Sequence, residues 1–311
     1  MAQIFYNETI PRQFYLLAFT NLHITSLTLP LFFGVLIMYL VSVLGNLIIT
    51  ILVCQVSKLH TPMYFFLCNL AVQDIIYVSS ILPKTLAITL TGDTAISFEG
   101  CIIQIFVFAF CIGTEFFLLT SMAYDRYVAI CIPLRYSLIM NKKVCSLIAT
   151  TSWLFGGITA WPYSVLMSNI SFCKSHEINH LFCNIRTLLR LSCSKATLLR
   201  SMILTGGTMF GIIPFIMIIV SYAHIIFSIH KIHTSAGKMK AFSSCSSHIV
   251  VVIIFFGATL SLHLKPETEN SEEIDKVLSL LYVAFVPMVN PLVYSLRNHQ
   301  VTKAIKKLLK I

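Results

Sequence analysis

Charge is scarce in this sequence of 311 residues. Only 11% of the residues are charged and 57% are hydrophobic, whereas about 25% of an ordinary soluble domain is charged. A water-soluble core of this size cannot bury so much apolar surface, so part of that surface must face lipid. The composition therefore excludes an ordinary soluble globular protein and predicts an integral membrane protein.

Long stretches lack any Asp, Glu, Lys or Arg. Five such stretches cover residues 13–57, 144–173, 201–230, 241–264 and 277–296. Two more contain one acid each, Asp74 or Glu115. Each can hold a helix of about 20 residues, and continuous apolar runs favour helices over a β-barrel. We predict an all-α membrane protein, a seven-transmembrane helix bundle, with helices at 26–53, 60–87, 98–131, 143–166, 198–229, 238–264 and 272–295.

The sequence also lacks internal repeats, low-complexity tracts and a domain linker. Its first residues do not follow the signal-peptide pattern, so we expect no cleaved signal peptide. We therefore expect one domain over 1–311, with an outer tail (1–25), the bundle (26–295) and a cytoplasmic tail (296–311). In the last segment, apolar residues and lysines alternate at helical spacing. This pattern predicts a short amphipathic helix on the inner membrane surface.

Lys and Arg set the expected orientation. With the N terminus outside, 13 of these residues are cytoplasmic and 9 are outside; leaving out the long outer loop reduces the outer count to 4. The net charge of +10 then suits anionic inner-leaflet lipid, and no nucleic-acid partner is needed to explain it. The sequon Asn7-Glu8-Thr9 lies in the outer tail, which predicts glycosylation at Asn7.

Four of the ten cysteines fall in predicted outer segments, namely Cys101, Cys173, Cys183 and Cys193. An oxidising exterior favours disulfides, but four cysteines allow three pairings and spacing selects none. A metal site is the alternative, since the order Cys-x2-His-x3-His-x2-Cys describes Cys173, His176, His180 and Cys183. We favour disulfides.

Several polar residues lie within the apolar runs, namely Asn46, Asp74, Glu115 and Asn290. A central charge in a membrane costs roughly 2.5–3.5 kcal/mol, so the two acids need a partner, a proton or water. The group is either a hydrated cluster that binds a sodium ion or changes protonation, or a buried network that ties helices together. The two interpretations are compatible.

Two motifs mark the expected inner ends of helices. Asp125-Arg126-Tyr127 is either an ion pair that reaches the membrane surface or a latch that releases Arg126 toward a partner. In the run from Asn290 to Tyr294, Pro291 removes a backbone donor and is a plausible hinge.

Five blocks resemble the signature blocks of vertebrate olfactory receptors, rhodopsin-like G-protein-coupled receptors, and most closely the tetrapod-type (class II) branch. They are LHTPMYFFLCNLAVQD (59–74), MAYDRYVAICIPLRY (122–136), SY (221–222), KAFSSCSSH (240–248) and PMVNPLVYSLRN (287–298). They occur in the family's order, and the resemblance covers essentially the whole chain.

The resemblance implies an odorant receptor of the plasma membrane, not an enzyme. It would bind small, mostly apolar volatile molecules and activate a stimulatory, olfactory-type heterotrimeric G protein that raises cyclic AMP. It implies disulfides Cys101–Cys183 and Cys173–Cys193 and an intramembrane cluster that includes Asn46, Asp74 and Glu115. The positions that match its activation and coupling residues are Asp125, Arg126, Tyr127, Tyr222, His248, Asn290, Pro291 and Tyr294.

The ligand pocket is expected between the outer halves of helices three, five, six and seven. The candidate contact residues are Phe108, Ala109, Ile112, Gly206, Gly207, Phe210, Phe256, Thr259, Leu260, His263, Leu280 and Val283. No acid is among them, so an amine ligand would lack a counter-ion. Ala109 replaces a common His, and Phe256 and His263 replace usual Tyr residues, so ligand preference does not carry over from the family.

Other classes of protein fit less well. A transporter predicts inverted repeats and paired broken helices, and an intramembrane enzyme predicts a nucleophile–base pair or metal ligands; neither set is evident. A rhodopsin-like receptor outside olfaction is the closest alternative.

Overall fold

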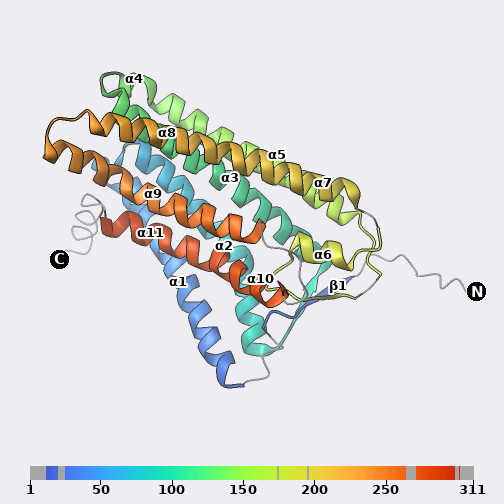
Figure 1. The fold of residues 1–311 in the computed structure, drawn as a ribbon. Coiled ribbons are helices and arrows are strands. Elements are labelled where there is room, and N and C mark those ends of the chain that lie inside the picture. The colour runs from blue at the N-terminus through green and yellow to red at the C-terminus, as the bar shows by residue number, and fades with distance from the viewer. Residues whose placement is uncertain are drawn as a thin grey trace, which may run out of the picture.

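The computed structural model describes residues 12–19, 25–173, 175–194, 196–263, 271–297 and 301. Seven membrane crossings within these residues are long and apolar enough to span a bilayer, which confirms the predicted bundle (Figure 1). Five of the crossings are single helices: α1 (Thr25–Gln55), α2 (Pro62–Thr91), α3 (Phe98–Cys131), α5 (Lys142–Ser168) and α9 (Ser235–His263). The predicted ends of these five helices lie within a few residues of the observed ones.

The fifth and seventh crossings each contain a wider π-helical turn. The fifth consists of α7 (Thr197–Gly206), η3 (Gly207–Ile212) and α8 (Ile213–His230), and the seventh of α10 (Ser271–Leu280), η4 (Leu281–Phe285) and α11 (Val286–Arg297). π-Turns inside helices are rare and often lie at functional sites. The end of the bundle that contains the N-terminal strand is called the outer end here. The first π-helical turn, η3, lies in the outer half of its crossing, and η4 lies at the middle of its crossing.

Local sequence explains several helix ends. Pro62 opens α2 at a position where its missing N–H costs nothing. The Ser97 hydroxyl accepts the Gly100 amide at 3.0 Å and caps α3, and the Asn141 side chain accepts the Val144 amide at 3.0 Å and caps α5. After α2, Gly92 adopts a left-handed conformation (φ 73°) that suits glycine.

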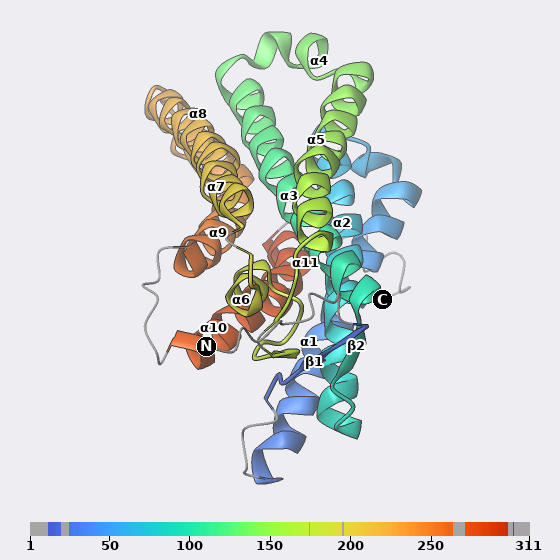
Figure 2. The ribbon, with the colours of Figure 1, turned by 90° about the vertical axis from the view of Figure 1, so that its right-hand side faces the viewer.

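Short elements connect the crossings at both ends of the bundle. The inner connections contain η1 (Ser57–Leu59), η2 (Pro133–Arg135) and α4 (Tyr136–Ile139). The outer loop contains α6 (Ile185–Leu191), which lies between α7 and α10 at the end of the bundle opposite α4 (Figure 2).

A small sheet at the outer end was not predicted. Strand β1 (Gln13–Leu16) pairs antiparallel with β2 (Ala95–Ser97) and parallel with β3 (Glu177–Ile178). The tail before α1 therefore joins the loop before α3 to the long outer loop, and this sheet holds the loop against the bundle.

Close helix packing depends on small residues. A Cβ atom at Gly156 of α5 would lie 2.7 Å from the Phe110 carbonyl oxygen of α3. A Cβ atom at Gly45 of α1 would lie 2.8 Å from Cγ of Pro291 in α11. Membrane helices commonly approach one another over small residues in this way. These two close contacts set the positions of α3 and α11, which contain many of the predicted activation residues.

The outer surface of the bundle is apolar. Large side chains such as Leu147 and Ile158 of α5 are 64% and 65% exposed. In water such a surface would be costly, whereas in lipid it needs no partner. The exposure of these residues agrees with a multi-pass membrane protein.

Three predictions fall on residues outside those that the structure describes. Asn7 lies in the first undescribed segment, and the amphipathic tail lies almost wholly in 298–311, of which only Val301 is described. The His263 backbone ends α9, but its side chain is not among those described. Glycosylation, the tail helix and the ligand contact of His263 stay predictions.

Candidate functional site

A cavity of about 520 Å³ lies in the outer half of the bundle. Its walls come from α3, α5, α7–η3–α8, α9 and α10–η4, and the outer loop and α6 complete it. The volume falls within the range of roughly 300–1,000 Å³ that is typical of small-molecule sites.

Most of the predicted ligand-contact residues line this cavity. Nine of the twelve do so: Phe108, Ala109, Ile112, Gly206, Gly207, Phe210, Phe256, Thr259 and Leu260. Gly206 has a specific reason to lack a side chain, because an added Cβ would collide with the hydroxyl of Tyr163, which donates to the Met202 carbonyl at 2.9 Å. The structure therefore brings together the predicted faces of helices three, five and six.

The seventh crossing lines the cavity with a different face of the helix from the one predicted. Asp275, Ser279 and Tyr282 line it, at spacings of four and three residues. Leu280 and Val283 do not line it; Val283 is buried in the core and Leu280 packs against that core. Each lies one position along from a lining residue, about 100° around the helix.

Aromatic rings close the inner end of the cavity. Phe116 of α3 lies 5.4 Å from Phe256 of α9 between ring centroids, and Phe256 lies 4.8 Å from Phe215 of α8. Nearer the outer loop, Phe108 contacts Phe182 at 5.0 Å and Tyr282 at 6.3 Å. These rings offer apolar surface to a ligand and exclude water from the inner end of the cavity.

His180 joins the outer loop to the seventh crossing. It is 3% exposed, and its Nδ1 accepts the Phe182 amide at a long 3.4 Å. Because Nδ1 accepts, Nε2 carries the proton and donates it to Ser279 Oγ at 3.2 Å. Burial lowers the pKa of His180 to about 4. The imidazole is therefore neutral at pH 7, and its hydrogen bond to Ser279 connects the outer loop to the seventh crossing.

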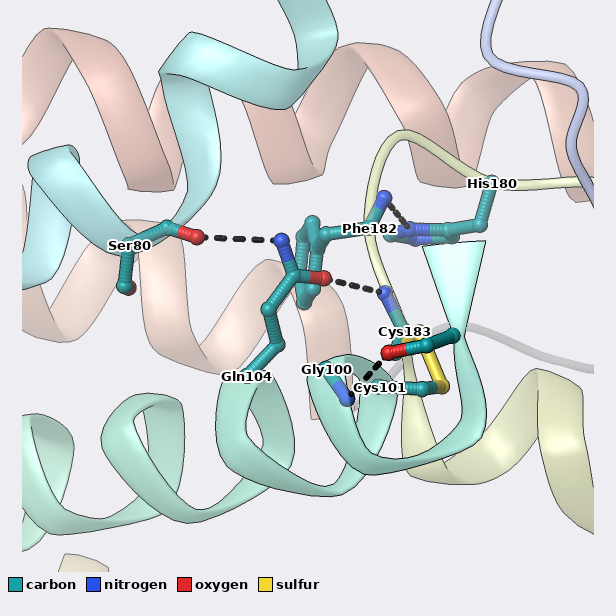
Figure 3. The surroundings of a disulfide bond; sticks show 8 residues. Ser80, Gly100, Cys101, Gln104, His180, Phe182 and Cys183 are labelled. Atoms are coloured by element: carbon teal, nitrogen blue, oxygen red, sulfur yellow. Dashed lines mark hydrogen bonds between the residues drawn. A yellow bond between two sulfur atoms is a disulfide. The ribbon is translucent and has the colours of Figure 1, made fainter. Parts of the chain in front are cut away.

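A disulfide holds the same loop against α3. Cys101 is bonded to Cys183, with Cα atoms 5.4 Å apart. Gln104 of α3 accepts the Cys183 amide at 3.2 Å and donates to the Ser80 carbonyl of α2 at 3.0 Å (Figure 3). The loop backbone is thus fixed where Phe182 and Cys183 line the cavity.

A second disulfide closes the loop on itself. Cys173 is bonded to Cys193, with Cα atoms 5.6 Å apart. An antiparallel bridge pairs Phe172 with Ser192 beside it. The structure thus contains both of the pairings that the resemblance implies. The outer cysteines form no metal site, and no cluster of three potential metal ligands occurs among the described side chains.

Charged side chains surround the outer mouth of the cavity, and the sequence analysis missed them. Arg186 and Arg190 of α6, Arg200 of α7 and Asp275 of α10 all line it. The expectation that no acid would lie near the ligand is therefore wrong, since Asp275 is present. Only the disulfide-anchored path of the loop brings α6 over the cavity, so no local pattern points to these residues.

The intramembrane polar residues form two buried pairs. Asn290 donates to Asp74 Oδ2 at 2.9 Å, and Gln73 donates to Glu115 Oε2 at 3.4 Å. The other carboxylate oxygens of Asp74 and Glu115, and Oε1 of Gln73, are buried without a hydrogen-bond partner within the described structure. Buried oxygens of this kind suit a bound cation, water or a proton on a carboxyl group.

Asn46 compensates for the proline in α11. Pro291 has no N–H, so the Pro287 carbonyl four residues earlier loses its helical donor. Asn46 Nδ2 of α1 donates to that carbonyl at 3.1 Å, and also to the Ser42 carbonyl at 2.9 Å. In lipid the backbone polar groups need such partners. Asn46 is thus a structural partner of the proline, and its hydrogen bonds within the described structure go to Ser42 and Pro287 rather than to the acids.

Asp125 accepts hydrogen bonds from two neighbouring side chains at the inner end of α3. It is fully buried and accepts from Arg126, from Nε at 3.0 Å and from Nη2. Tyr136 of α4 donates to Asp125 Oδ1 at 2.7 Å, and burial raises the pKa of Tyr136, which keeps this donor protonated. Arg126 Nη1 also donates to Ser244 Oγ of α9 at 2.8 Å. One arginine thus joins α3 to α9.

His248 links three helices beside this pair. Its Nε2 donates to the Leu119 carbonyl at 3.1 Å, so its Nδ1 accepts from the Tyr222 hydroxyl at 2.6 Å. Tyr294 is also buried, and Tyr127 lies against His224 with ring centroids 5.8 Å apart. Of the predicted activation residues, those on α3, α8 and α9 therefore lie at the inner end of the bundle. Asn290 and Pro291 of α11 lie deeper in the bundle, beside Asp74 and Asn46.

Comparison with known proteins agrees with this arrangement. The olfactory receptor family model matches residues 35–310. Human olfactory receptor 2T2 is 43% identical over 296 residues, which covers 93% of this chain and 91% of that protein. Human olfactory receptor 8D1 is 44% identical over 283 residues, with 91% and 92% covered. Gorilla olfactory receptor 1G1 is 42% identical over 279 residues, with 90% and 89% covered.

A match of this extent identifies the class as well as the fold. The seven spans agree with a multi-pass protein of the plasma membrane, and the family function is odorant reception through a G protein, without enzymatic activity. The chain belongs to the olfactory receptor family of rhodopsin-like G-protein-coupled receptors.

Proposed function

We propose that this receptor binds an odorant in the outer cavity and activates a stimulatory, olfactory-type G protein, which raises cyclic AMP. One observation carries the proposal: a cavity under a disulfide-held loop lies at one end, and a buried cluster around Arg126 lies at the other. The long helices α3 and α9 run between the two sites. A ligand that shifts these helices at the outer end changes the contacts of Arg126.

The N terminus lies outside in this proposal. Both disulfides are at the end that contains β1, and disulfides form and persist in an oxidising compartment. The excess of Lys and Arg at the other end also supports this orientation.

The cavity suits a small molecule with an apolar body. Phe108, Phe116 and Phe256 supply apolar wall, while the hydroxyls of Thr259 and Tyr282 and the His180–Ser279 pair supply polar groups. A ligand with one polar group would place that group toward these residues and its hydrocarbon part against the rings.

Arg126 is the proposed coupling residue. In the described state Asp125 and Ser244 hold it against the bundle, and movement of α9 away from α3 would break its bond to Ser244. The freed guanidinium would then offer donors to the G protein. Asp74 and Glu115 would respond to the same movement by taking a sodium ion or a proton; their unpartnered oxygens suit either one.

A cyclic AMP reporter tests the proposal. Cells that express the receptor and the olfactory G protein would be exposed to a panel of alcohols, ketones, esters, aldehydes and acids. We expect a saturable response to at least one compound, absent from cells without the receptor. No response at verified surface expression, to any compound or with any class of G protein, would overturn the proposal.

A further inference from the structure

Among the described residues that line the mouth of the cavity, positive charges outnumber negative ones. Arg186, Arg190 and Arg200 contribute three positive charges to its lining, and Asp275 contributes one negative charge. His180, the histidine of the lining, is neutral at pH 7 because burial lowers its pKa to about 4. The described lining therefore has an excess of two positive charges.

The arginines come from two elements that meet over the cavity. Arg186 and Arg190 are four residues apart in α6, so they lie on one face of that helix. Arg200 lies in the first turn of α7. It is exposed, and its guanidinium has no side-chain partner among the described residues. Lys276 of the seventh crossing does not line the cavity and is paired with Glu273 at 2.7 Å.

The described residues at the opposite end of the cavity carry no charge. Phe116, Phe215 and Phe256 close it, and its α3 wall is formed by Phe108, Ala109 and Ile112. A ligand that fills the cavity from mouth to floor would meet cations at one end and hydrocarbon at the other. The cationic end of the cavity favours an anionic group on the ligand, because guanidinium groups bind carboxylates with paired, charge-assisted hydrogen bonds.

We propose that the cavity is selective for small carboxylates with an apolar tail, such as a medium-chain fatty acid or an aryl carboxylate. The tail lies against the phenylalanines and the carboxylate lies at the arginine-lined mouth. This inference rests on the proposed function and specifies its ligand class. The cationic mouth also raises the local concentration of anions and repels protonated amines. Asp275 does not reverse this, because three arginines surround the same opening.

A matched ligand series tests the proposal. The probes are octanoate, methyl octanoate, octan-1-ol and octylamine, together with 3-phenylpropanoate and its methyl ester, each applied to receptor-expressing cells with the cyclic AMP reporter. We expect each acid to be at least about tenfold more potent than its ester, at the low end for a charge-assisted hydrogen bond because the mouth is partly exposed. Octylamine should be inactive.

Variants locate the effect. Arg200→Gln should weaken the acids about tenfold and leave the neutral compounds unchanged, and Arg200→Lys should retain part of the preference. Arg186→Gln should act in the same direction. Arg12→Gln is the matched control, since Arg12 is an exposed arginine beside β1 that does not line the cavity. Surface labelling confirms that each variant reaches the membrane.

The outcomes separate this proposal from the proposed function. If neutral odorants activate the receptor while the acids are no better than their esters, the carboxylate proposal is overturned and the receptor function stands. Equal effects of Arg200→Gln and Arg12→Gln would also overturn it. A failure of every compound, neutral or acidic, would overturn both.

Discussion

The two ends of the bundle are built in opposite ways. The outer end surrounds a cavity with aromatic rings, and the missing side chain of Gly206 leaves space for the hydroxyl of Tyr163. The inner end has buried side-chain hydrogen bonds around Asp125 and His248 that connect one helix to the next. The outer end can therefore vary with the ligand, while the inner end depends on fixed partners and changes only by exchanging them.

The largest effect is expected at the inner end. Arg126→Ala should abolish odorant-stimulated cyclic AMP, because it removes the guanidinium that we propose contacts the G protein. Surface expression should change little, since the cavity and both disulfides are at the other end. Arg135→Ala is the control, an exposed arginine in the short inner helix η2. A normal response of Arg126→Ala at matched surface levels would contradict the assignment.

Releasing Arg126 from Asp125 should raise basal cyclic AMP instead of abolishing the response. Asp125→Asn removes the negative charge that holds Arg126, so we expect basal cyclic AMP to rise several-fold. Tyr136→Phe removes one donor to Asp125 and should give a smaller rise. Reporter activity without ligand, normalised to surface receptor, measures both. Unchanged basal signalling in both variants would show that this ion pair is not a restraint.

The sequence predicts some parts of the molecule better than others, depending on whether they are set by local pattern or by long-range contacts. Charge-free runs predict the helices, and helical spacing predicts that Phe108, Ala109 and Ile112 share a face, because both depend on local pattern. The placement of Arg186 and Arg190 over the cavity depends on a bond between Cys101 and Cys183, which are 82 residues apart. The pairing of β1 with β3 is also long-range. No local periodicity encodes such contacts.

A moderate effect on stability is expected between the two ends. Asn46→Ala would leave the Pro287 carbonyl without its donor in a buried site. We expect the receptor to lose about 1–2 kcal/mol of stability, in the range of interhelical hydrogen bonds in membranes. Thermal unfolding of the detergent-purified receptor measures this. Thr151→Ala, at a half-buried threonine of α5 whose hydroxyl bonds only its own helix, should change it little. Equal melting temperatures for all three proteins would contradict the role of Asn46.

The smallest effect concerns pH at the outer loop. The pKa of His180 is about 4 because burial disfavours its charged form, although Asp275 partly offsets this and Lys276 opposes protonation. A histidine whose pKa is lowered on folding stabilises the protein above its unfolded pKa of roughly 6.5, and this contribution is lost as pH falls toward 4. The melting temperature of the wild type should therefore fall more between pH 7 and pH 5 than that of His180→Gln. Identical slopes would show that His180 is not the titrating group.

The central claim is that the outer cavity receives the odorant and the inner cluster transmits the response. Ala109→Trp tests it most directly, because the large ring would fill the cavity from α3 and leave the inner end intact. Leu147→Trp, on the lipid-facing surface of α5, is the matched control. Cyclic AMP dose–response curves at equal surface expression should show loss of the odorant response in Ala109→Trp, with basal signalling retained, and a normal response in Leu147→Trp. A wild-type dose–response curve for Ala109→Trp with every active odorant would contradict the account.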